Sequence, residues 1–156
     1  MKKVMIALDY DPSAKKIAET GYALAKTMGA EIILLHVIAE AYYYSSLEYS
    51  PIVGFTGFTD MIPVEVDIDK GLNRAAESYL DSLKQLLEDT TIQTVVREGD
   101  FAVSILEAAK DMHADIIVMG SHSRKWLENI LMGSVTEKVL KHTTIPLFII
   151  PTKRPK

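Results

Sequence analysis

Short apolar segments alternate along the chain with longer segments whose apolar residues recur at helical spacing. Each short segment is typical of a strand buried on both faces of a sheet, and each longer one of an amphipathic helix. The predicted strands are residues 4–8, 32–37, 92–96, 116–119 and 146–150. The predicted helices are residues 14–28, 68–86, 101–112 and a segment that opens at Gly133-Ser134. We expect Asp11 or Ser13 to cap the first helix and Asp100 to cap the third. Gly29 should end the first helix.

Five strands that alternate with four helices predict an α/β fold, with one doubly wound parallel sheet and helices on both of its faces. We expect this single domain to span residues 1–152, followed by a short basic tail at 153–156. Pro146 and Pro151 bracket the last strand, which predicts a position at the edge of the sheet. Because an apolar edge strand can pair with another chain, the sequence predicts a homodimer through residues 146–150.

The composition narrows the class of protein. With 156 residues, of which 48% are hydrophobic and 24% charged, the chain fits one soluble globular domain. A formal net charge of −4 argues against nucleic-acid binding through bulk positive charge. The absence of cysteine excludes disulfides, thiol catalysis and Cys-ligated zinc. No apolar run is long enough for a membrane span or a signal-peptide core, so we expect a cytoplasmic protein with no membrane partner.

Candidate binding residues follow several predicted strands. In an open parallel sheet, ligands bind beyond the carboxyl ends of the strands, at the point where the strand order reverses. Ala7 and Asp9 close the first strand, Val37 closes the second, and a loop that begins at Gly120 follows the fourth. Asp9 can accept a hydrogen bond from a ligand, or it can form the turn into the next helix. The sequence alone leaves both interpretations open.

The loop after the fourth strand contains two turns whose backbone could bind an anion. Gly120 can take a sharp turn at the sheet edge, and Gly133 lets a ligand approach the backbone closely. Ser134 and Glu137 form an S-x-x-E capping box, which predicts a helix start whose N–H groups attract an anion. Arg124 adds positive charge to this loop. Glycines and serine caps of this kind also occur in α/β domains without a ligand, so the spacing alone leaves both possibilities open.

The pattern Gly-x2-Gly-x9-Gly-Ser after the fourth strand resembles the ATP-binding motif of the universal stress protein family. The segment here is Gly120-Ser121-His122-Ser123, nine residues, and then Gly133-Ser134. It is neither a P-loop, which needs Gly-Lys-Ser/Thr, nor the Rossmann fingerprint G-x-G-x-x-G. Asp9 and Leu34-Leu35-His36-Val37 also match the family, and the resemblance covers nearly the whole chain.

The resemblance implies a sheet in the order 3-2-1-4-5 with an adenine nucleotide between strands one and four. It implies adenine near Asp9 and the backbone of Val37, and ribose and phosphates near the Gly120 loop and the start of the following helix. It also implies a divalent cation, Mg²⁺ or Mn²⁺, at the phosphates, and dimers that pair their last strands. The candidate binding residues are, together, Ala7, Asp9, Val37, Met119, Gly120, Ser121, His122, Ser123, Arg124, Gly133, Ser134, Val135 and Thr136.

Ser123 departs from the family motif, which has glycine at this position. If the position needs a positive φ, serine costs about 1 kcal/mol or more there, although its hydroxyl can donate to a phosphate. The remaining small motif residues favour binding, either weaker or directed to AMP or ADP. We therefore predict a regulatory stress-response homodimer that binds ATP, AMP or ADP and is recognised by an unknown protein partner. The alternatives are a nucleotide-free interaction protein of the same fold and a slow ATPase, and no side chain is assigned to catalysis.

Half of the aromatic residues lie in one segment, residues 38–63, which is too long for a plain connection. We expect either a lid or dimer contact, because exposed aromatic rings favour a partner, or a surface excursion that packs on its own rings. No histidine lies three or four residues from another, so no helical metal site is predicted. His36 is expected to be a core residue with its polar atoms satisfied.

Overall fold

The computed structural model describes residues 1–39, 64–121 and 133–152. Its centre is a five-stranded sheet in the order β3-β2-β1-β4-β5, in which all neighbouring strands are parallel. The strands are β1 (Lys3–Leu8), β2 (Glu31–Ile38), β3 (Gln93–Glu98), β4 (Ile116–Gly120) and β5 (Leu147–Ile150). The helices are α1 (Ala14–Thr27), α3 (Val64–Leu86), α4 (Phe101–Asp111) and α5 (Ser134–His142). The predicted fold class and strand order are confirmed.

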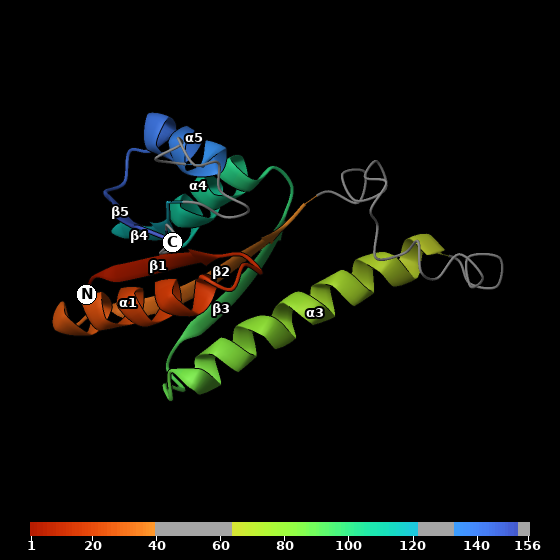
Figure 1. Ribbon diagram of the computed structural model, residues 1–156, viewed down its shortest axis with the longest axis horizontal. Helices are drawn as coiled ribbons and strands as arrows, with labels where there is room; N and C mark the ends of the chain where they lie inside the picture. Colours follow the sequence, from red (N-terminus) through yellow and green to blue (C-terminus); the bar gives the residue numbers. More distant parts are fainter. Residues whose placement is uncertain (40–63, 122–132, 153–156) are drawn as a thin grey trace, which may run out of the picture.

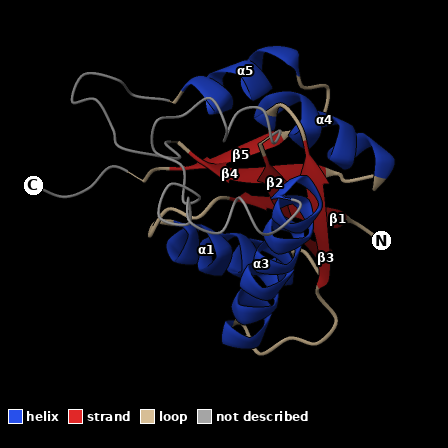
Figure 2. Ribbon diagram, turned by 90° about the vertical axis from the view of Figure 1, so that its right-hand side faces the viewer, coloured by secondary structure: helices blue, strands red, loops and turns tan. Residues whose placement is uncertain are grey.

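Helices cover both faces of the sheet, with α1 and α3 on one face and α4 and α5 on the other (Figure 1, Figure 2). Alternate residues of β1 belong to the two resulting core layers. Val4 and Ile6 pack in the layer beneath α1 and α3, whereas Met5 packs in the layer beneath α4 and α5. All three side chains are 0% exposed. Because both faces of β1 are buried, its apolar residues follow one another without a polar interruption.

The two edge strands are less buried than the inner ones. β3 exposes part of every residue, and Phe148 on β5 is 40% exposed. β5 pairs with β4 and with no other strand in the described part of the chain, which confirms its predicted edge position. Its second hydrogen-bonding edge can therefore accept a further strand.

The predicted helix caps are only partly confirmed. Asp100 caps α4, because its carboxylate accepts the Val103 N–H at 3.0 Å. Gly29 follows the C-cap of α1 with φ +64°, as a terminating glycine should. Ser13 occupies the N-cap position of α1, but its side chain makes no capping bond. Asp11 accepts the Ser13 N–H at 2.8 Å instead.

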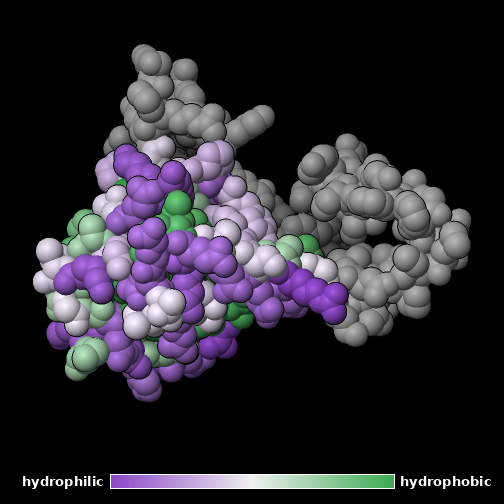
Figure 3. Space-filling model, turned by 90° about the horizontal axis from the view of Figure 1, so that it is seen from below, coloured by the Kyte–Doolittle hydropathy of each residue, from purple (hydrophilic) through white to green (hydrophobic). Residues whose placement is uncertain are grey.

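α3 is the longest helix of the described residues, and its first turns project past the carboxyl ends of the strands (Figure 1). Its inner face contributes Ala76, Leu80 and Leu83 to the core. The outer surface of α1 and α3 is mainly hydrophilic (Figure 3). This contrast explains the helical spacing of apolar residues in the sequence.

Two predicted segments fall mostly outside the described residues. The aromatic segment was expected to begin at Ile38, but this residue is the last of β2 and is buried, while residues 40–63 are not described. The basic tail, 153–156, also lies outside the described residues. Within residues 1–39, 64–121 and 133–152, no helix combines the length and apolarity that a bilayer crossing requires.

Candidate functional site

The strand order reverses on either side of β1. β2 and β3 lie on one side of β1, and β4 and β5 lie on the other. In the β1–β4 pair, Ile6 lies opposite Val118. Leu8 and Gly120, each two residues further along, therefore end at the same edge of the sheet. In folds of this class, ligands bind at this edge.

Gly120 is the last residue of β4, and its surroundings leave no space for a side chain. A Cβ atom at this position would lie 2.5 Å from Cδ1 of Ile17 and 2.9 Å from Cγ2 of Thr152. The sequence predicts a sharp turn here, but Gly120 continues the strand. Among the described glycines, a positive φ occurs at Gly29 and Gly99. The turn prediction is therefore wrong, and glycine suits this position because a larger residue would displace the side chains of Ile17 and Thr152.

Ser121 connects the end of β4 to β5 and to α5. Its N–H donates to the Ile150 carbonyl at 2.9 Å, and its hydroxyl oxygen accepts the Thr152 N–H at 3.0 Å. Its own carbonyl accepts the Gly133 N–H at 2.6 Å. Ser121 is buried, so these contacts give this candidate binding residue a structural role. They also bring the two ends of the segment 122–132 together.

The amino end of α5 differs from the predicted capping box. Gly133 is the N-cap, with φ −69° and ψ 161°, and Ser134 is the first helical residue. Among the described residues, no side-chain capping hydrogen bond is present at this helix end. The Glu137 carboxylate pairs instead with Lys141 at 3.2 Å. The predicted helix start is correct, but the predicted Ser134–Glu137 capping box is wrong.

α5 is attached to β4 by a buried hydrogen bond. The Thr136 hydroxyl donates to the Gly120 carbonyl at 2.9 Å, and Thr136 is only 2% exposed. This contact places the amino end of α5 beside the carboxyl end of β4. In any α-helix, the N–H groups of the first turn have no acceptor within the helix, and the dipole is positive there. In α5 these N–H groups belong to Ser134, Val135 and Thr136.

Asp9 forms the turn that leads from β1 to α1. Its Oδ1 accepts the Asp11 N–H at 3.0 Å. Asp11 in turn accepts the Ser13 N–H with its side chain and the Ala14 N–H with its backbone carbonyl. The turn-forming role that the sequence left open is thus present. It is compatible with a ligand contact, because a carboxylate has more than one acceptor site. Asp9 is partly exposed at the sheet edge.

Three ring side chains pack beneath this turn. Tyr79 on α3 donates its hydroxyl hydrogen to the Asp9 carbonyl, and Nδ1 of His36 lies 2.8 Å from the Leu8 carbonyl. The ring of Tyr10 lies 4.3 Å from that of His36 and 4.8 Å from that of Tyr79, measured between centroids. The sequence predicts the helix that contains Tyr79, but it gives neither Tyr79 nor Tyr10 a role at this site. The contacts join segments far apart in the chain, so no local pattern indicates them.

Burial keeps the rings of His36 and Tyr79 neutral. Burial lowers the pKa of His36, although its hydrogen bond to the Leu8 carbonyl partly opposes this shift. Because a carbonyl can only accept, the neutral imidazole must carry its proton on Nδ1. Burial, followed by the nearby charge of Asp9, raises the pKa of Tyr79 above its ordinary value. The Tyr79 hydroxyl therefore remains a donor throughout the physiological pH range.

The structure gathers four other candidate residues on the α4–α5 face of the sheet. Val37 and Met119 are buried members of one apolar cluster on this face. Ala7 on β1 and Val135 on α5 are partly buried and pack against it. Three further candidates, His122, Ser123 and Arg124, lie outside the described residues. The described part of the site therefore consists of the β1 and β2 ends, the β4 end and the amino end of α5.

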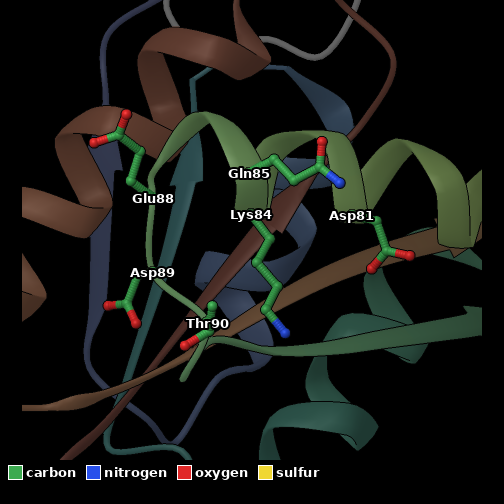
Figure 4. A pocket seen from close by; sticks show the side chains of 6 residues that line it. All are labelled: Asp81, Lys84, Gln85, Glu88, Asp89 and Thr90. Atoms are coloured by element: carbon green, nitrogen blue, oxygen red, sulfur yellow. The ribbon is translucent and has the colours of Figure 1, made fainter.

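Two surface hollows lie elsewhere, along α3. One, of about 370 Å³, is lined by Asp81, Lys84, Gln85, Glu88, Asp89 and Thr90 (Figure 4). The other, of about 300 Å³, is lined by Asn73, Glu77, Asp81, Thr94 and Val96. Neither includes a candidate residue, and the first lies where α3 ends, at the opposite edge of the sheet from the β1 turn.

The sequence and the fold of this chain are similar to those of known proteins. Residues 1–151 match the model of the universal stress protein family. Universal stress protein MJ0577 of Methanocaldococcus jannaschii is 30% identical over 97% of this chain and 96% of its own length. The Bacillus subtilis universal stress protein YxiE is 30% identical over 95% of this chain and 97% of its own. The solved structure of MJ0577 has a TM-score of 0.76 at 29% identity and covers 99% of this chain and 98% of its own. A universal stress protein solved in complex with cAMP shares the fold, with a TM-score of 0.61, 17% identity, and coverage of 97% of this chain and 98% of its own.

Proposed function

Because this chain belongs to the universal stress protein family, we propose that it binds an adenine nucleotide between β1 and β4 and acts as a regulatory protein in the stress response. The observation that carries the proposal is the attachment of α5 to β4. The Thr136–Gly120 bond and the Gly133–Ser121 bond hold the amino end of a helix at the edge where the strand order reverses. This brings a helix dipole and free N–H groups to the place where the fold binds ligands.

The phosphates would bind at the amino end of α5. Gly133 has no side chain to hinder a ligand, and the N–H groups of Ser134 and Val135 can donate to phosphate oxygens. Ser121, His122, Ser123 and Arg124 belong to the same proposed phosphate and ribose region, as the sequence motif suggests. An acidic protein with a net charge of −4 needs such local donors to hold an anion.

The adenine ring would lie near Asp9 and the backbone of Val37. The Asp9 carboxylate can accept a hydrogen bond from the exocyclic amino group, and Ala7 and Met119 supply apolar surface. In the cAMP complex of another universal stress protein, a protein of this fold holds an adenine nucleotide. ATP, ADP and AMP share this base, so all three can make the same contacts with Asp9 and Val37.

A divalent cation, Mg²⁺ or Mn²⁺, would accompany the phosphates. Within the described residues, no three histidine or carboxylate side chains converge to hold a metal ion. The ion would therefore be held mainly by phosphate oxygens and water, which suits Mg²⁺. When bound, it would neutralise phosphate charge.

The dimer would form through β5. In the part of the chain that the structure describes, no strand pairs with the outer side of β5, and Phe148 on this strand is 40% exposed. Two such edges can pair as strands of a continuous sheet. We propose that the bound nucleotide changes the surface of this homodimer and that a protein partner recognises the change.

Calorimetry with ATP, ADP and AMP, each with and without Mg²⁺, tests the proposal. We expect binding that Gly133→Val weakens at least about tenfold, because the added side chain enters the phosphate position. The backbone of Gly133 is extended and suits any residue, so the fold should survive. Gly71→Val is the matched control, since a Cβ there meets open space. No binding at millimolar nucleotide would favour a nucleotide-free interaction protein, and several turnovers per minute would favour an ATPase.

A further inference from the structure

The peptide that follows β1 is held by side chains from two other elements. His36 on β2 donates from Nδ1 to the Leu8 carbonyl at 2.8 Å. Tyr79 on α3 donates to the next carbonyl along the chain, that of Asp9. Two consecutive carbonyl groups, those of Leu8 and Asp9, are therefore fixed by side-chain donors that remain neutral. The position of the backbone at these two residues is thus set by these donors as well as by the hydrogen bonds within the turn.

The same turn fixes the side chain of Asp9. Its Oδ1 accepts the Asp11 N–H at 3.0 Å, so the carboxylate and the backbone of Asp9 are held from two directions. Loss of the Tyr79 hydroxyl would leave the Asp9 carbonyl without this donor and allow the backbone at Asp9 to shift. A shift of the Asp9 Cα would displace the carboxylate, because the side chain is attached to that atom.

We propose that Tyr79 is a positioning residue for base recognition, which holds Asp9 where its carboxylate meets the exocyclic amino group of adenine. This inference rests on the proposed function, and it adds a residue on α3 that lies outside the binding motif. The Tyr10 ring packs against both Tyr79 and His36, with 53% of its surface exposed, so the three rings form one support beneath the turn.

The chemistry of the base provides a specific readout. Adenine has an amino group at C6, which donates to a carboxylate, whereas hypoxanthine has a carbonyl oxygen there, which a carboxylate repels. A well-placed Asp9 should therefore bind ATP more tightly than inosine triphosphate. A site that can bond a polar group discriminates strongly against an analogue without that group.

The test measures the affinities of ATP and inosine triphosphate in Tyr79→Phe. This substitution removes only the hydroxyl and retains the ring contacts. We expect ATP affinity to fall about fivefold to tenfold, the equivalent of one hydrogen bond, while inosine triphosphate affinity changes less than about twofold. Tyr22→Phe is the matched control, because it removes a tyrosine hydroxyl bonded at 3.1 Å to Asp89, away from the site. The control should leave both affinities unchanged.

A double-mutant cycle separates positioning from general destabilisation. Asp9→Asn should abolish the preference for ATP, and adding Tyr79→Phe to it should leave the ATP-to-inosine ratio where it was. If the wild type binds ATP and Tyr79→Phe keeps the wild-type ratio, the inference is overturned and the proposed function stands. If the wild type binds neither nucleotide, the proposed function fails and the inference fails with it. Equal losses for both nucleotides would also overturn the positioning role, because they indicate a structural effect alone.

Discussion

The hydroxyl of Thr136 donates to the carbonyl of Gly120 at 2.9 Å inside the protein. The bond joins the first turn of α5 to the last residue of β4, across 16 positions of sequence. Together with the bond from the Gly133 N–H to the Ser121 carbonyl, it adds directional contacts to the apolar packing, which alone would specify the axial position of the helix less well. The bond therefore fixes how far the amino end of α5 extends beyond the sheet edge.

Replacing Thr136 with valine should destabilise the protein. The shape is retained, but the buried Gly120 carbonyl loses its donor, which costs about 1–3 kcal/mol in the free energy of unfolding. Urea denaturation measures this change. Thr27→Val is the control, because the exposed Thr27 hydroxyl bonds carbonyls of its own helix. Equal effects of the two substitutions would contradict the structural role of Thr136.

Gly120→Ala should also destabilise, because the new methyl group overlaps Cδ1 of Ile17. Overpacking of this kind typically costs about 1–3 kcal/mol. Ile17→Val removes Cδ1, so the double variant should recover part of the loss and the two effects should not add. Gly71→Ala, in open space on α3, is the control and should stabilise by up to about 1 kcal/mol. Strict additivity of Gly120→Ala and Ile17→Val would refute the steric explanation.

Glycine should stabilise the two helix ends at which other residues adopt a left-handed conformation. Glu88 follows α3 with φ 54°, and His113 follows α4 with φ 56°. A side chain at such a position costs about 1 kcal/mol, part of which the greater freedom of glycine in the unfolded chain cancels. We expect Glu88→Gly and His113→Gly each to raise the free energy of unfolding by about 0.5 kcal/mol. Glu107→Gly, within α4, should lower it, and a fall in all three would contradict the prediction.

The protein should lose stability as the pH falls from 7 towards 5. Burial lowers the pKa of His36, so the unfolded chain takes up a proton near pH 6.5 that the folded chain does not. The contribution of His36 is therefore present above its unfolded pKa and is lost as the pH falls through its lower folded pKa. Melting temperatures of the wild type and His36→Gln across this range test the point. The slope should flatten in His36→Gln and persist in His142→Gln, which replaces an exposed histidine; an unchanged slope in both would contradict the assignment.

The inner strands were predictable because burial on both faces leaves an unbroken apolar signature. Val4, Met5 and Ile6 show it most clearly, and their positions in two core layers follow from simple alternation. The Asp100 cap was equally predictable, because the acceptor and the bonded N–H lie within one turn. The sequence is sufficient to predict a structural element when the residues that determine it are neighbours in the chain or follow a regular period.

The parts that could not be predicted depend on contacts between distant segments. The hydrogen bond between Tyr79 and Asp9 spans 70 positions of sequence, and the identity of these two residues does not indicate that they are in contact. Gly120 looks like a turn glycine, and only the approach of α1 shows that the space is occupied. Ser134 and Glu137 have the spacing of a capping box, but Gly133 occupies the N-cap and Glu137 pairs with Lys141.

The Gly133 N–H meets the Ser121 carbonyl at 2.6 Å, so the chain returns to the place where it left the sheet. Segments with adjoining ends tolerate insertion and deletion at little entropic cost. Residues 122–132 can therefore be exchanged or lengthened without changing the register of β4 and β5. The length and sequence of this stretch can therefore vary independently of the stability of the domain.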